Sequence, residues 1–481
     1  MYENTTGNTT SVVGNGSRDG NDNELAELDL VALNKFSRQN AAFGAETTAK
    51  LIKMKVIIFG LRGVGAETAK NLALQGVGAI TLVDNNPVSI QDLGLNFFFT
   101  ENDVSQSSSR AAVFAPKLRE LNPMCDVKVG AEVNEDILKA HSALVVTDST
   151  ILKSQLVQLD AMCRKIGKSF LYAYTGGVNS SIFVDHGDKH VVNDADGEKP
   201  TTKLILNITP TENVNEFLIR YDTPEGQVPT TIDEGHYKLS DIIGCDALNG
   251  RIIPVSHPYK DPVKTIRATI EGIPSLDGYV PSGLLTEEKI PKAYPMASLE
   301  SKIKNPGSPF TNDMVMSDLL NFSEQQVHVA TIAVLSFVES NGRRYPTTDD
   351  LSAVIAEAKR LIASKEVDIE DFEVNEDVVK KVTAYAGIEL QPMAAFLGGV
   401  LAQEVVKVTG KFTPIPGWFH FSAFETLPSE PPADTTPRGS RYDHVAAVFG
   451  WDFVEKLGNL KYFMVGCGAA AFFPSILCRH F

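Results

Sequence analysis

The residues of this chain best suited to chemistry form a glycine turn, which is followed at a fixed spacing by an acid. Gly60, Gly63 and Gly65 come directly after the apolar run 56–59, and Asp84 closes the next apolar run. Glycines let a backbone approach a phosphate closely, and the N–H groups that open the following helix favour anions. A carboxylate about 20 residues after such a turn can accept both hydroxyl groups of a ribose. The pattern predicts a nucleotide fold, and a related fold that keeps these glycines only for packing is an open alternative.

The same pattern occurs again near the other end of the chain, at one constant offset and without a gap. The matched residues are Phe43, Gly44, Leu51, Lys55 and Gly60 in the first copy and Phe449, Gly450, Leu457, Lys461 and Gly466 in the second. Each copy leads from a short helix through an apolar strand into a glycine turn. A gapless repeat around such a turn predicts two related nucleotide-binding folds. We expect the second of them to be unfinished within this sequence.

A sheet and helices must position these turns, and the region 55–172 has the matching pattern. Predicted strands cover 56–59, 80–83, 143–147 and 169–172, and predicted helices cover 66–75, 110–121 and 152–166. The strand at 56–59 is apolar throughout, as is typical of a parallel sheet that is buried on both faces. The alternation predicts an α/β fold of the doubly wound, Rossmann-like kind.

The remainder of the chain changes character twice and then returns to the α/β pattern. Short β-rich runs separated by Pro, Gly and Asp predict an all-β insert, and helical periodicity then predicts a small helical bundle. The ranges are 202–272 for the insert, 323–338, 347–363 and 375–386 for the bundle, and 392–408 and 418–421 for the returning helix and strand. The returning helix carries Ala395, Gly399 and Ala402, small residues that we expect to permit close packing on the sheet.

Composition and charge argue against several classes of function. The net charge of −16 disfavours a nucleic-acid partner, because nucleic-acid binding draws on clustered Lys and Arg. No apolar run approaches the roughly 18–20 residues of a membrane span, so no membrane partner is predicted. The five cysteines are scattered without a Cys-x-x-Cys pair, which disfavours disulfides and a zinc site. With no secretory signal at the N-terminus, these features predict a protein of the cytoplasm and the nucleus.

Several longer segments are unusual enough to identify a family. They are Phe36–Gln39, Gly60–Gly65, Asp92–Val104, Phe183–Asp188, Phe396–Val405, Gly410–Pro414 and Arg441–Asp443. Together they resemble the ubiquitin-activating enzymes over nearly all of residues 30–470. The resemblance implies ThiF/MoeB-like adenylation folds, of which the first is an inactive copy. It also identifies the β-rich insert as the first catalytic-cysteine half-domain, which carries no nucleophile, and the helical region as a four-helix bundle.

The resemblance implies a division of the chain. It comprises a disordered tail (1–24), an inactive adenylation domain in two segments (25–181 and 379–427), the first catalytic-cysteine half-domain (182–284), the helical bundle (285–378), a linker (428–437) and the truncated start of an active adenylation domain (438–481).

The chemistry of the family is the transfer of AMP from ATP, with Mg²⁺, to the C-terminal carboxylate of ubiquitin, followed by transfer of ubiquitin to a cysteine. The resemblance implies ubiquitin as a partner, and ubiquitin-conjugating enzymes as partners of a complete enzyme only. Because two anions meet in the first step, cations must surround the triphosphate. Active copies carry an arginine and a lysine where this chain has Leu95 and Ser108. Each missing charge-assisted contact is worth roughly 1.5–3 kcal/mol, so we expect ATP to be unbound or unreactive in the first copy.

Other residues of the two copies take their roles from the same resemblance. The vestigial nucleotide-site positions are Gly60, Gly63, Gly65, Asp84, Leu95, Ser108 and Asp148, and the positions that resemble nucleotide-binding residues of an active site are Arg38, Gly466, Gly468 and Ala469. Asp84 and Asp148 are read as acids without cationic partners, so they are predicted to cap strand ends. Arg38 resembles an arginine that reaches across to ATP held by the other half.

No cysteine of the chain matches the thioester-forming cysteine of the family, and no residue is assigned as a metal ligand. The family is a class of ATP-dependent ligases, yet this chain alone is expected to be a catalytically incomplete fragment. One alternative is a non-catalytic partner subunit of a two-chain modifier-activating enzyme. Another is a nicotinamide-dependent oxidoreductase, which the spacing Gly-x-x-Gly-x-Gly disfavours, since the usual spacing is Gly-x-Gly-x-x-Gly.

Overall fold

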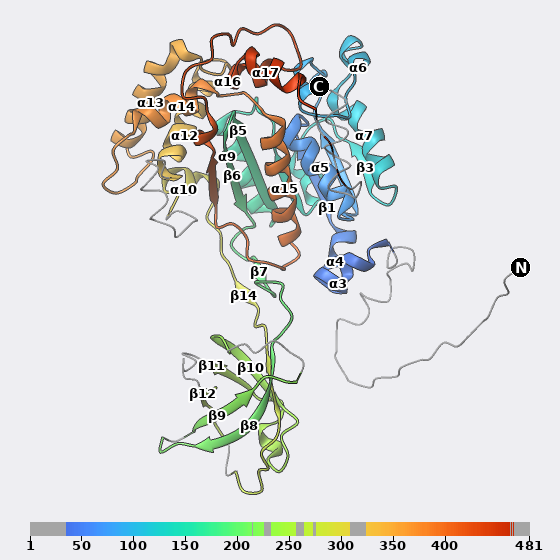
Figure 1. The fold of residues 1–481 in the computed structure, drawn as a ribbon, viewed down its shortest axis with the longest axis vertical. Helices are drawn as coiled ribbons and strands as arrows, with labels where there is room; N and C mark the ends of the chain where they lie inside the picture. Colours follow the sequence, from blue (N-terminus) through green and yellow to red (C-terminus); the bar gives the residue numbers. More distant parts are fainter. Residues whose placement is uncertain are drawn as a thin grey trace, which may run out of the picture.

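The structure is a computed structural model, and it describes residues 35–213, 215–225, 232–255, 264–272, 276–307, 324–461, 463 and 465. Figure 1 shows a central sheet with helices on both faces, a helical cluster beside it and a smaller separate sheet below it. The predicted fold class, a doubly wound Rossmann-like α/β domain with an all-β insert and a small helical bundle, is confirmed.

The central sheet has seven strands in the order β15-β6-β5-β4-β1-β2-β3. Their bounds are β1 Lys55–Phe59, β2 Ala79–Val83, β3 Asp126–Val129, β4 Ala143–Val146, β5 Ser169–Gly176, β6 Asn179–Asp185 and β15 Trp418–Ser422. Strands β3, β2, β1, β4 and β5 are parallel, while β6 and β15 each pair antiparallel with their neighbours. The parallel order is that of a Rossmann fold, in which ligands bind beyond the carboxyl ends of β1 and β4, where the strand order reverses.

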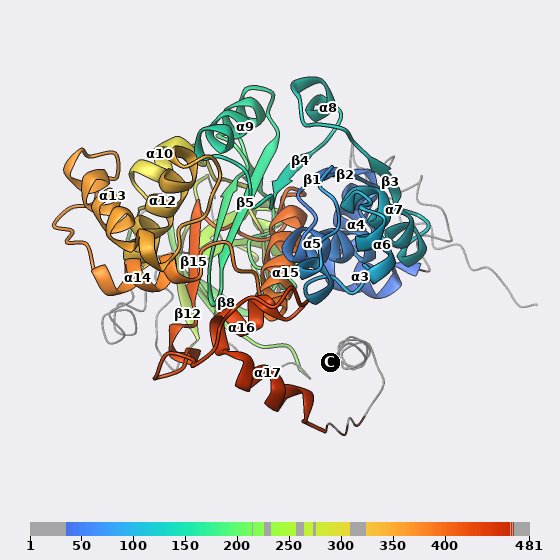
Figure 2. The same cartoon turned by 90° about the horizontal axis from the view of Figure 1, so that it is seen from above.

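Successive residues of β1 reach two separate cores on opposite faces of the sheet, as the two-residue period of a strand requires. The helices concerned are α5 (Gly63–Leu74), α7 (Arg110–Leu121) and α15 (Gln391–Lys407) on one face, and α9 (Lys153–Lys165) and α12 (Glu324–Ser340) on the other. Val56 and Ile58 lie in the first core and Ile57 in the second, and all three are fully buried. Figure 2 shows the two helical layers from above. Two short helices, α6 (Glu101–Ser105) and α8 (Glu135–Lys139), lie at the margin.

Helix α15 packs against α5 through Gly398 and not through the predicted Gly399. A Cβ atom at Gly398 would lie 2.5 Å from the Cβ of Glu67, whereas one at Gly399 would meet no atom within 4 Å. Ala402 is buried, as predicted, but Ala395 is only partly buried. The prediction for Gly399 is therefore wrong by one position, because the buried face of the helix is rotated by one residue.

The predicted all-β insert forms a six-stranded sheet in the order β11-β10-β13-β8-β9-β12. The bounds are β8 Thr202–Pro210, β9 Glu216–Asp222, β10 Gly235–Ser240, β11 Ile252–Val255, β12 Thr265–Thr269 and β13 Leu284–Glu287. Its inner face has a core of its own, in which Ile219, Leu239 and Ile266 are fully buried. A two-stranded sheet, β7 (Val191–Val192) with β14 (Lys292–Ala293), lies between it and the central sheet (Figure 1).

Among the described residues, four helices belong to the predicted helical cluster, and buried histidines connect it to the central sheet. The helices are α10 (Leu299–Lys304), α12, α13 (Leu351–Ala363) and α14 (Glu376–Ala384). Because His328 Nε2 lies 3.0 Å from the carbonyl oxygen of Ile303, it must carry the hydrogen, and its Nδ1 accepts from His420 Nε2 at 3.2 Å. His420 Nδ1 then accepts from the Ser181 hydroxyl at 2.7 Å. Both rings are therefore neutral, and burial lowers the pKa of His328 to about 4.

The internal repeat is visible in the two helix pairs that precede the glycine turns. The bounds are α3 Ser37–Phe43, α4 Ala45–Lys53, α16 Asp443–Phe449 and α17 Trp451–Gly458. Helices α3 and α16 both have seven residues, and each ends at a glycine with positive φ, 86° at Gly44 and 83° at Gly450. In Figure 1, α16 lies above the central sheet and α3 below it, so the two copies approach opposite ends of the first fold.

The predicted domain division stays a prediction, and β6 spans its boundary at residue 182 while pairing in the central sheet. The tail 1–24 lies outside the described residues, as do Gly466, Gly468 and Ala469 of the second turn. Among the described residues, none of the helices is long and apolar enough to cross a bilayer.

Candidate nucleotide pocket

The glycine turn of the first copy is held so tightly that its glycines are needed for packing. Gly60 has φ +99°, and a Cβ atom there would lie 2.4 Å from the backbone nitrogen of Asp148. A Cβ at Gly65 would lie 1.9 Å from the carbonyl oxygen of Gly60, and one at Gly63 would lie 2.8 Å from the Cβ of Ala394. The turn therefore brings the ends of β1 and β4 and the start of α5 together, whether or not a ligand is bound.

Asp84 lies at the end of β2, where the sequence places it, and it fixes the turn through backbone hydrogen bonds. Its carboxylate accepts the N–H of Leu61 at 2.9 Å and the N–H of Asn86 at 3.0 Å. Arg110 Nη1 lies 3.4 Å from the same carboxylate, so the prediction that Asp84 has no cationic partner is wrong. Burial raises the pKa of Asp84, and Arg110 opposes that shift. The carboxylate is thus engaged by protein donors at the position where a ribose would need it.

A second acid occupies the start of α5, where a phosphate would be expected. Glu389 Oε1 accepts the N–H of Val64 at 2.7 Å. The first N–H groups of a helix have no partner within the helix, and they form its anion site. Burial raises the pKa of Glu389, while Arg62, whose Nε lies 3.7 Å from Glu389 Oε2, lowers it. A side chain of this protein therefore already holds one of the donors that would bind a phosphate.

Both arginines near the turn are paired with buried acids. Arg62 Nε lies 3.5 Å from Asp92, and Arg110 Nε lies 2.7 Å from the other oxygen of the same carboxylate. The side chain of Asp92 is fully buried. Neither guanidinium is left as an unopposed positive charge that faces solvent.

The residues around the turn line an open cavity of about 480 Å³. It is lined by Gly60, Arg62, Asp84, Asn86, Pro87, Ser89, Gln91, Arg110, Thr147, Asp148, Ser149, Thr150, Gly387 and His444. The lining contains two arginines and two acids, Asp84 and Asp148. The arginines also pair with two further buried acids, Asp92 and Glu389. Acids therefore outnumber arginines in and around the cavity, which disfavours a triphosphate.

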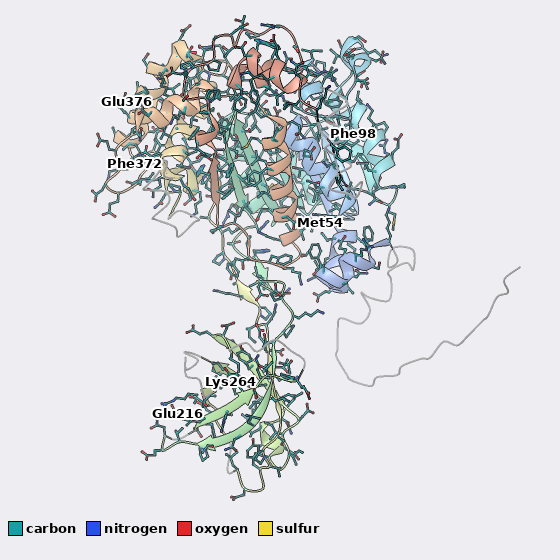
Figure 3. The ribbon with its side chains drawn as sticks, in the orientation of Figure 1. Met54, Phe98, Glu216, Lys264, Phe372 and Glu376 are labelled. Carbon is teal, nitrogen blue, oxygen red and sulfur yellow. The ribbon has the colours of Figure 1, made fainter. Side chains whose placement is uncertain are left out.

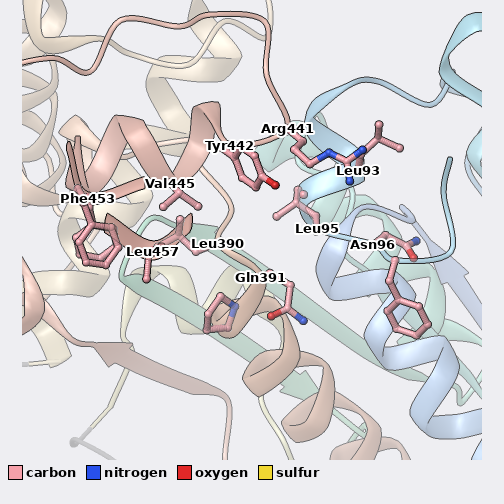
Figure 4. Close-up of a pocket in the computed structure, with 14 residues that line it drawn as sticks. Leu93, Leu95, Asn96, Leu390, Gln391, Arg441, Tyr442, Val445, Phe453 and Leu457 are labelled. Carbon is pink, nitrogen blue, oxygen red and sulfur yellow. The ribbon is translucent and has the colours of Figure 1, made fainter. Parts of the chain in front are cut away.

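Of the remaining predicted positions, Asp148 lines this cavity, whereas Ser108 and Leu95 do not. Asp148 Oδ1 accepts the backbone N–H and the hydroxyl of Thr150, both at 2.8 Å, as expected of a strand-end cap. Ser108 uses its carbonyl oxygen to accept the N–H of Val88 at 2.9 Å. Leu95 is buried and lines a different cavity of about 350 Å³ (Figure 4), which is mostly apolar.

Arg38 does not approach the cavity of its own half. It is exposed on α3, which is anchored at the far end of α5, because a Cβ at Gly76 would lie 2.6 Å from the ring of Phe36. Gln39 Nε2 also donates to the carbonyl oxygen of Gln75 at 2.8 Å. Since α5 has 12 residues, it separates α3 from the glycine turn by roughly 18 Å.

The corresponding residue of the second copy does line the cavity. Arg38 is the second residue of α3, and His444 is the second residue of α16. His444 Nδ1 lies 3.0 Å from the carbonyl oxygen of Glu389. Burial lowers the pKa of His444 to about 4, so its ring is neutral near pH 7 and adds no positive charge.

Sequence reasoning missed Arg62, Arg110, Glu389 and His444 as parts of this site. Arg62 stands inside the glycine turn and His444 follows from the repeat, so both had a signal in the sequence. Glu389 had none, because it lies 325 residues from the N–H that it accepts.

Side chains able to act as nucleophiles or metal ligands are not gathered elsewhere in the described part of the chain. No group of three His, Cys, Asp or Glu with metal-binding geometry occurs among the described residues. Cys125, Cys163 and Cys245 are buried, and burial raises the pKa of the Cys125 thiol to about 11.

The fold and the turn define a class of protein. Residues 36–434 match the ThiF family, and the chain belongs to that family.

The chain is also similar to curated proteins over most of its length. The chain is 33% identical over 454 residues to ubiquitin-like modifier-activating enzyme 1 of Rattus norvegicus, covering 90% of this chain and 40% of that protein. It is 32% identical over 484 residues to ubiquitin-activating enzyme E1 1 of Triticum aestivum, covering 96% of this chain and 43% of that protein. The chain thus spans about two-fifths of the length of these relatives.

A solved structure with partial similarity is the E. coli MccB crystal structure with succinimide, with 20% sequence identity and a TM-score of 0.29. The match covers 32% of this chain and 50% of that one.

Proposed function

We propose that this chain acts in the activation of ubiquitin, as the part of a ubiquitin-activating enzyme that contains the non-adenylating fold. In this proposal ubiquitin is the partner, and the protein works in the cytoplasm and the nucleus. ATP and Mg²⁺ are used at the site of a second adenylation fold, and the first fold supplies a scaffold. The relatives named as ubiquitin-activating enzymes, at about one-third identity over most of this chain, support the proposal.

The observation that carries the non-adenylating assignment is the contact between Glu389 and the start of α5. A carboxylate accepts the N–H of Val64 at 2.7 Å, so an incoming phosphate would have to displace a buried acid. It would also meet Asp84 and Asp148 in the lining, while Arg110 is paired with acids. ATP with Mg²⁺ therefore does not fit the first cavity, and we assign no reaction step to it.

Arg38 fits a role at the other fold, and the repeat supports that role. Helix α16 places His444 at the cavity of the first fold. If the two copies are related by an approximate two-fold rotation, α3 places Arg38 at the cavity of the second fold in the same way. An arginine there would stabilise the charge that develops when a carboxylate attacks the α-phosphate.

The proposal is tested by titrating this chain with Mg-ATP and with ¹⁵N-labelled ubiquitin separately. We expect no saturable heat from Mg-ATP in calorimetry, and specific chemical-shift changes in ubiquitin. Micromolar ATP binding that is abolished by Asp84→Ala would contradict the non-adenylating assignment. Unchanged ubiquitin spectra at saturating chain concentration would contradict the assignment of ubiquitin as the partner.

One variant sharpens the calorimetric experiment. Glu389→Gln removes the charge at the start of α5 and keeps an oxygen that can accept the N–H of Val64. If the buried acid excludes phosphate, this variant should bind Mg-ATP more tightly than the parent chain. Equal, undetectable binding by both would show that the missing cations at Leu95 and Ser108 are sufficient to exclude the nucleotide.

A further inference from the structure

The six-stranded domain is joined to the ThiF fold by two connections, and both connections touch helix α9. The outgoing connection begins where β6 ends, at Asp185, and the returning one includes Met296 and reaches α10 at Leu299. These connections are held to each other by the short strands β7 and β14. They are also joined by hydrogen bonds from the N–H of Met296 to the carbonyl oxygen of Gly187 at 3.0 Å and from the N–H of Tyr294 to the carbonyl oxygen of His190 at 2.8 Å. The outgoing connection also binds the segment after α15, where the N–H of Phe412 donates to the carbonyl oxygen of Asp194 at 2.6 Å. The contacts with α9 are therefore one of several attachments that hold the smaller domain at its base.

Arg164 of α9 binds both connections. Its Nη1 donates to Asp185 Oδ2 at 2.6 Å and to the carbonyl oxygen of Met296 at 3.0 Å. Asp185 Oδ1 accepts the N–H of Gly187 at 2.7 Å. Both oxygens of Asp185 are thus satisfied by donors, one of them charged, and the side chain of Asp185 is fully buried.

Asp160, one turn earlier on α9, binds the returning connection and faces Asp185. Its Oδ2 accepts the N–H of Leu299 at 2.7 Å. Its Oδ1 is buried and has no hydrogen-bond partner among the described residues, and the neighbouring Asp185 is the largest cause after burial of the raised pKa of Asp160. Both carboxyl groups are about 1% exposed. Two adjacent buried carboxylates cannot both be ionised, so one of them holds a proton.

The proton belongs to Asp160, because Asp185 has the guanidinium partner. As a carboxylic acid, Asp160 donates to Asp185 while it still accepts from Leu299, and every polar atom of the cluster is then satisfied. Burial, with Asp185 as the next cause, raises the pKa of Asp160 to about 8.

The other titratable groups nearby leave this assignment intact. On α9, burial raises the pKa of Cys163 to about 12, so that thiol is neutral. After β6, burial lowers the pKa of His186 to about 3, with His190 and Lys407 of α15 as smaller causes, so that ring is neutral too. Burial lowers the pKa of Arg164, but Asp185, followed by Asp160 and Asp188, raises it overall, so its guanidinium is charged. Helix α10 contributes the N–H of Leu299.

We propose that Asp160 and Asp185 form a proton-dependent latch, which fastens both connections of the six-stranded domain to α9 while Asp160 is protonated and releases the returning connection when Asp160 is ionised. Ionisation places two negative charges side by side in a buried site, and separation of Leu299 and α10 from α9 relieves the repulsion. The latch is a property of the described fold and does not depend on the proposed function.

The direction of the pH effect follows from the raised pKa. An Asp160 exposed by opening has an ordinary pKa near 3.8, whereas the closed form retains its proton up to about pH 8. Between these values the closed form binds the extra proton, so its stability relative to the open form is highest below the ordinary pKa and falls as pH rises. The opening equilibrium should increase by up to tenfold per pH unit and level off above about pH 8.

Hydrogen exchange of the full chain tests the latch. The measured quantity is the protection factor of the Leu299 amide and its neighbours in α10, corrected for the intrinsic pH dependence of exchange, with amides of β4 as the reference. We expect protection to fall by up to tenfold per unit between about pH 6 and 8. Asp160→Asn preserves a donor to Asp185 and an acceptor for Leu299 but cannot ionise, so its protection should not depend on pH.

The matched control is Asp136→Asn, which removes an equally negative side chain that is 92% exposed on α8 and should keep the parent pH dependence. Protection of Leu299 that is independent of pH in the parent chain, or that varies equally in Asp160→Asn, would overturn the proposal. If Asp160→Asn does not fold, the infrared carbonyl band of a protonated carboxylic acid in the parent decides the matter. It should be present near pH 6 and lost well above pH 8, and its absence near pH 6 would contradict the latch.

Discussion

Arg110 lies in a cavity that has the position of a nucleotide site, but its positive charge is paired with acids of the protein itself. Its guanidinium contacts Asp84 at 3.4 Å and Asp92 at 2.7 Å, through different nitrogens. In a nucleotide site such a guanidinium would face a phosphate, whereas here it neutralises two acids that the fold itself buries. Arginine suits this task, because its planar fork can serve two carboxylates at once.

We predict that Arg110→Ala destabilises the ThiF fold by about 3–5 kcal/mol, since removal of one partner leaves buried charges uncompensated. The free energy of unfolding in urea at pH 7 measures the effect. Arg110→Lys should be intermediate, because one ammonium group cannot hold both acids. Lys139→Ala, which removes a surface partner of Asp136 on α8, should leave the unfolding curve unchanged. A loss for Arg110→Ala of less than about 1 kcal/mol would mean that water reaches these acids.

Single residues of the site were predictable from sequence only where the contact is local. Asp84 and Asp148 cap strand ends as predicted, because each binds backbone within two residues or across the adjacent turn. Arg110 was not recognised as a partner, although it begins a helix that points at Asp84. Glu389 depends on the placement of α15 next to α5, which no local pattern specifies.

At the scale of elements, α15 illustrates why a helix can be predicted while its buried face is not. The sequence contains two adjacent glycines, Gly398 and Gly399, among several small residues. Small residues therefore recur at a helical spacing on two neighbouring faces, and apolar periodicity cannot choose between them. The structure chooses Gly398, because only that position lets the backbone of α15 approach Glu67 and Thr68 of α5.

The two glycines provide a matched pair of substitutions in one helix. We predict that Gly398→Ala destabilises the fold by about 1–3 kcal/mol, since its Cβ would lie 2.9 Å from the backbone nitrogen of Thr68. Gly399→Ala should stabilise it by roughly 0.5–1 kcal/mol, because alanine favours the helix and its Cβ meets open space. Urea unfolding of both variants measures the difference. Effects of the same sign and size would contradict the observed packing of α15 on α5.

Strands were predicted well where they are continuously apolar and poorly where they are short and mixed. β1, β2, β4 and β5 appear where apolar runs predict them. β10 was missed, because its sequence Gly-His-Tyr-Lys-Leu-Ser buries only Tyr237 and Leu239. The pairing of β6 with β15 was also beyond sequence reasoning, since these strands are separated by the whole six-stranded domain and the helical cluster.

At the scale of the whole molecule, the repeat bears on the proposal that Arg38 acts at the second adenylation fold. Helices α3 and α16 have the same length and the same terminal glycine, but they lie at opposite ends of the first fold (Figure 1). α16 reaches the cavity of the first fold with a neutral His444. α3 presents an exposed arginine away from that cavity. Figure 3 labels Met54, which directly follows α4, at the lower end of the same fold. If each fold receives this helix from the other copy, the second fold receives Arg38 of α3, and the first fold receives His444 of α16.

The last prediction compares substitutions of the equivalent residues Arg38 and His444 in an enzyme that contains both adenylation folds in full. Arg38→Ala should slow ATP–pyrophosphate exchange with ubiquitin by about 10- to 100-fold, because a charge-assisted contact to the reacting phosphate is lost. Arg38→Lys should recover part of the rate, since the charge remains without the planar fork. His444→Ala should leave the rate unchanged, because in the proposed function its cavity holds no nucleotide. Equal losses of rate for Arg38→Ala and His444→Ala would show that both cavities contribute to catalysis. An unaltered rate for Arg38→Ala would show that Arg38 is an exposed surface residue without a role in adenylation.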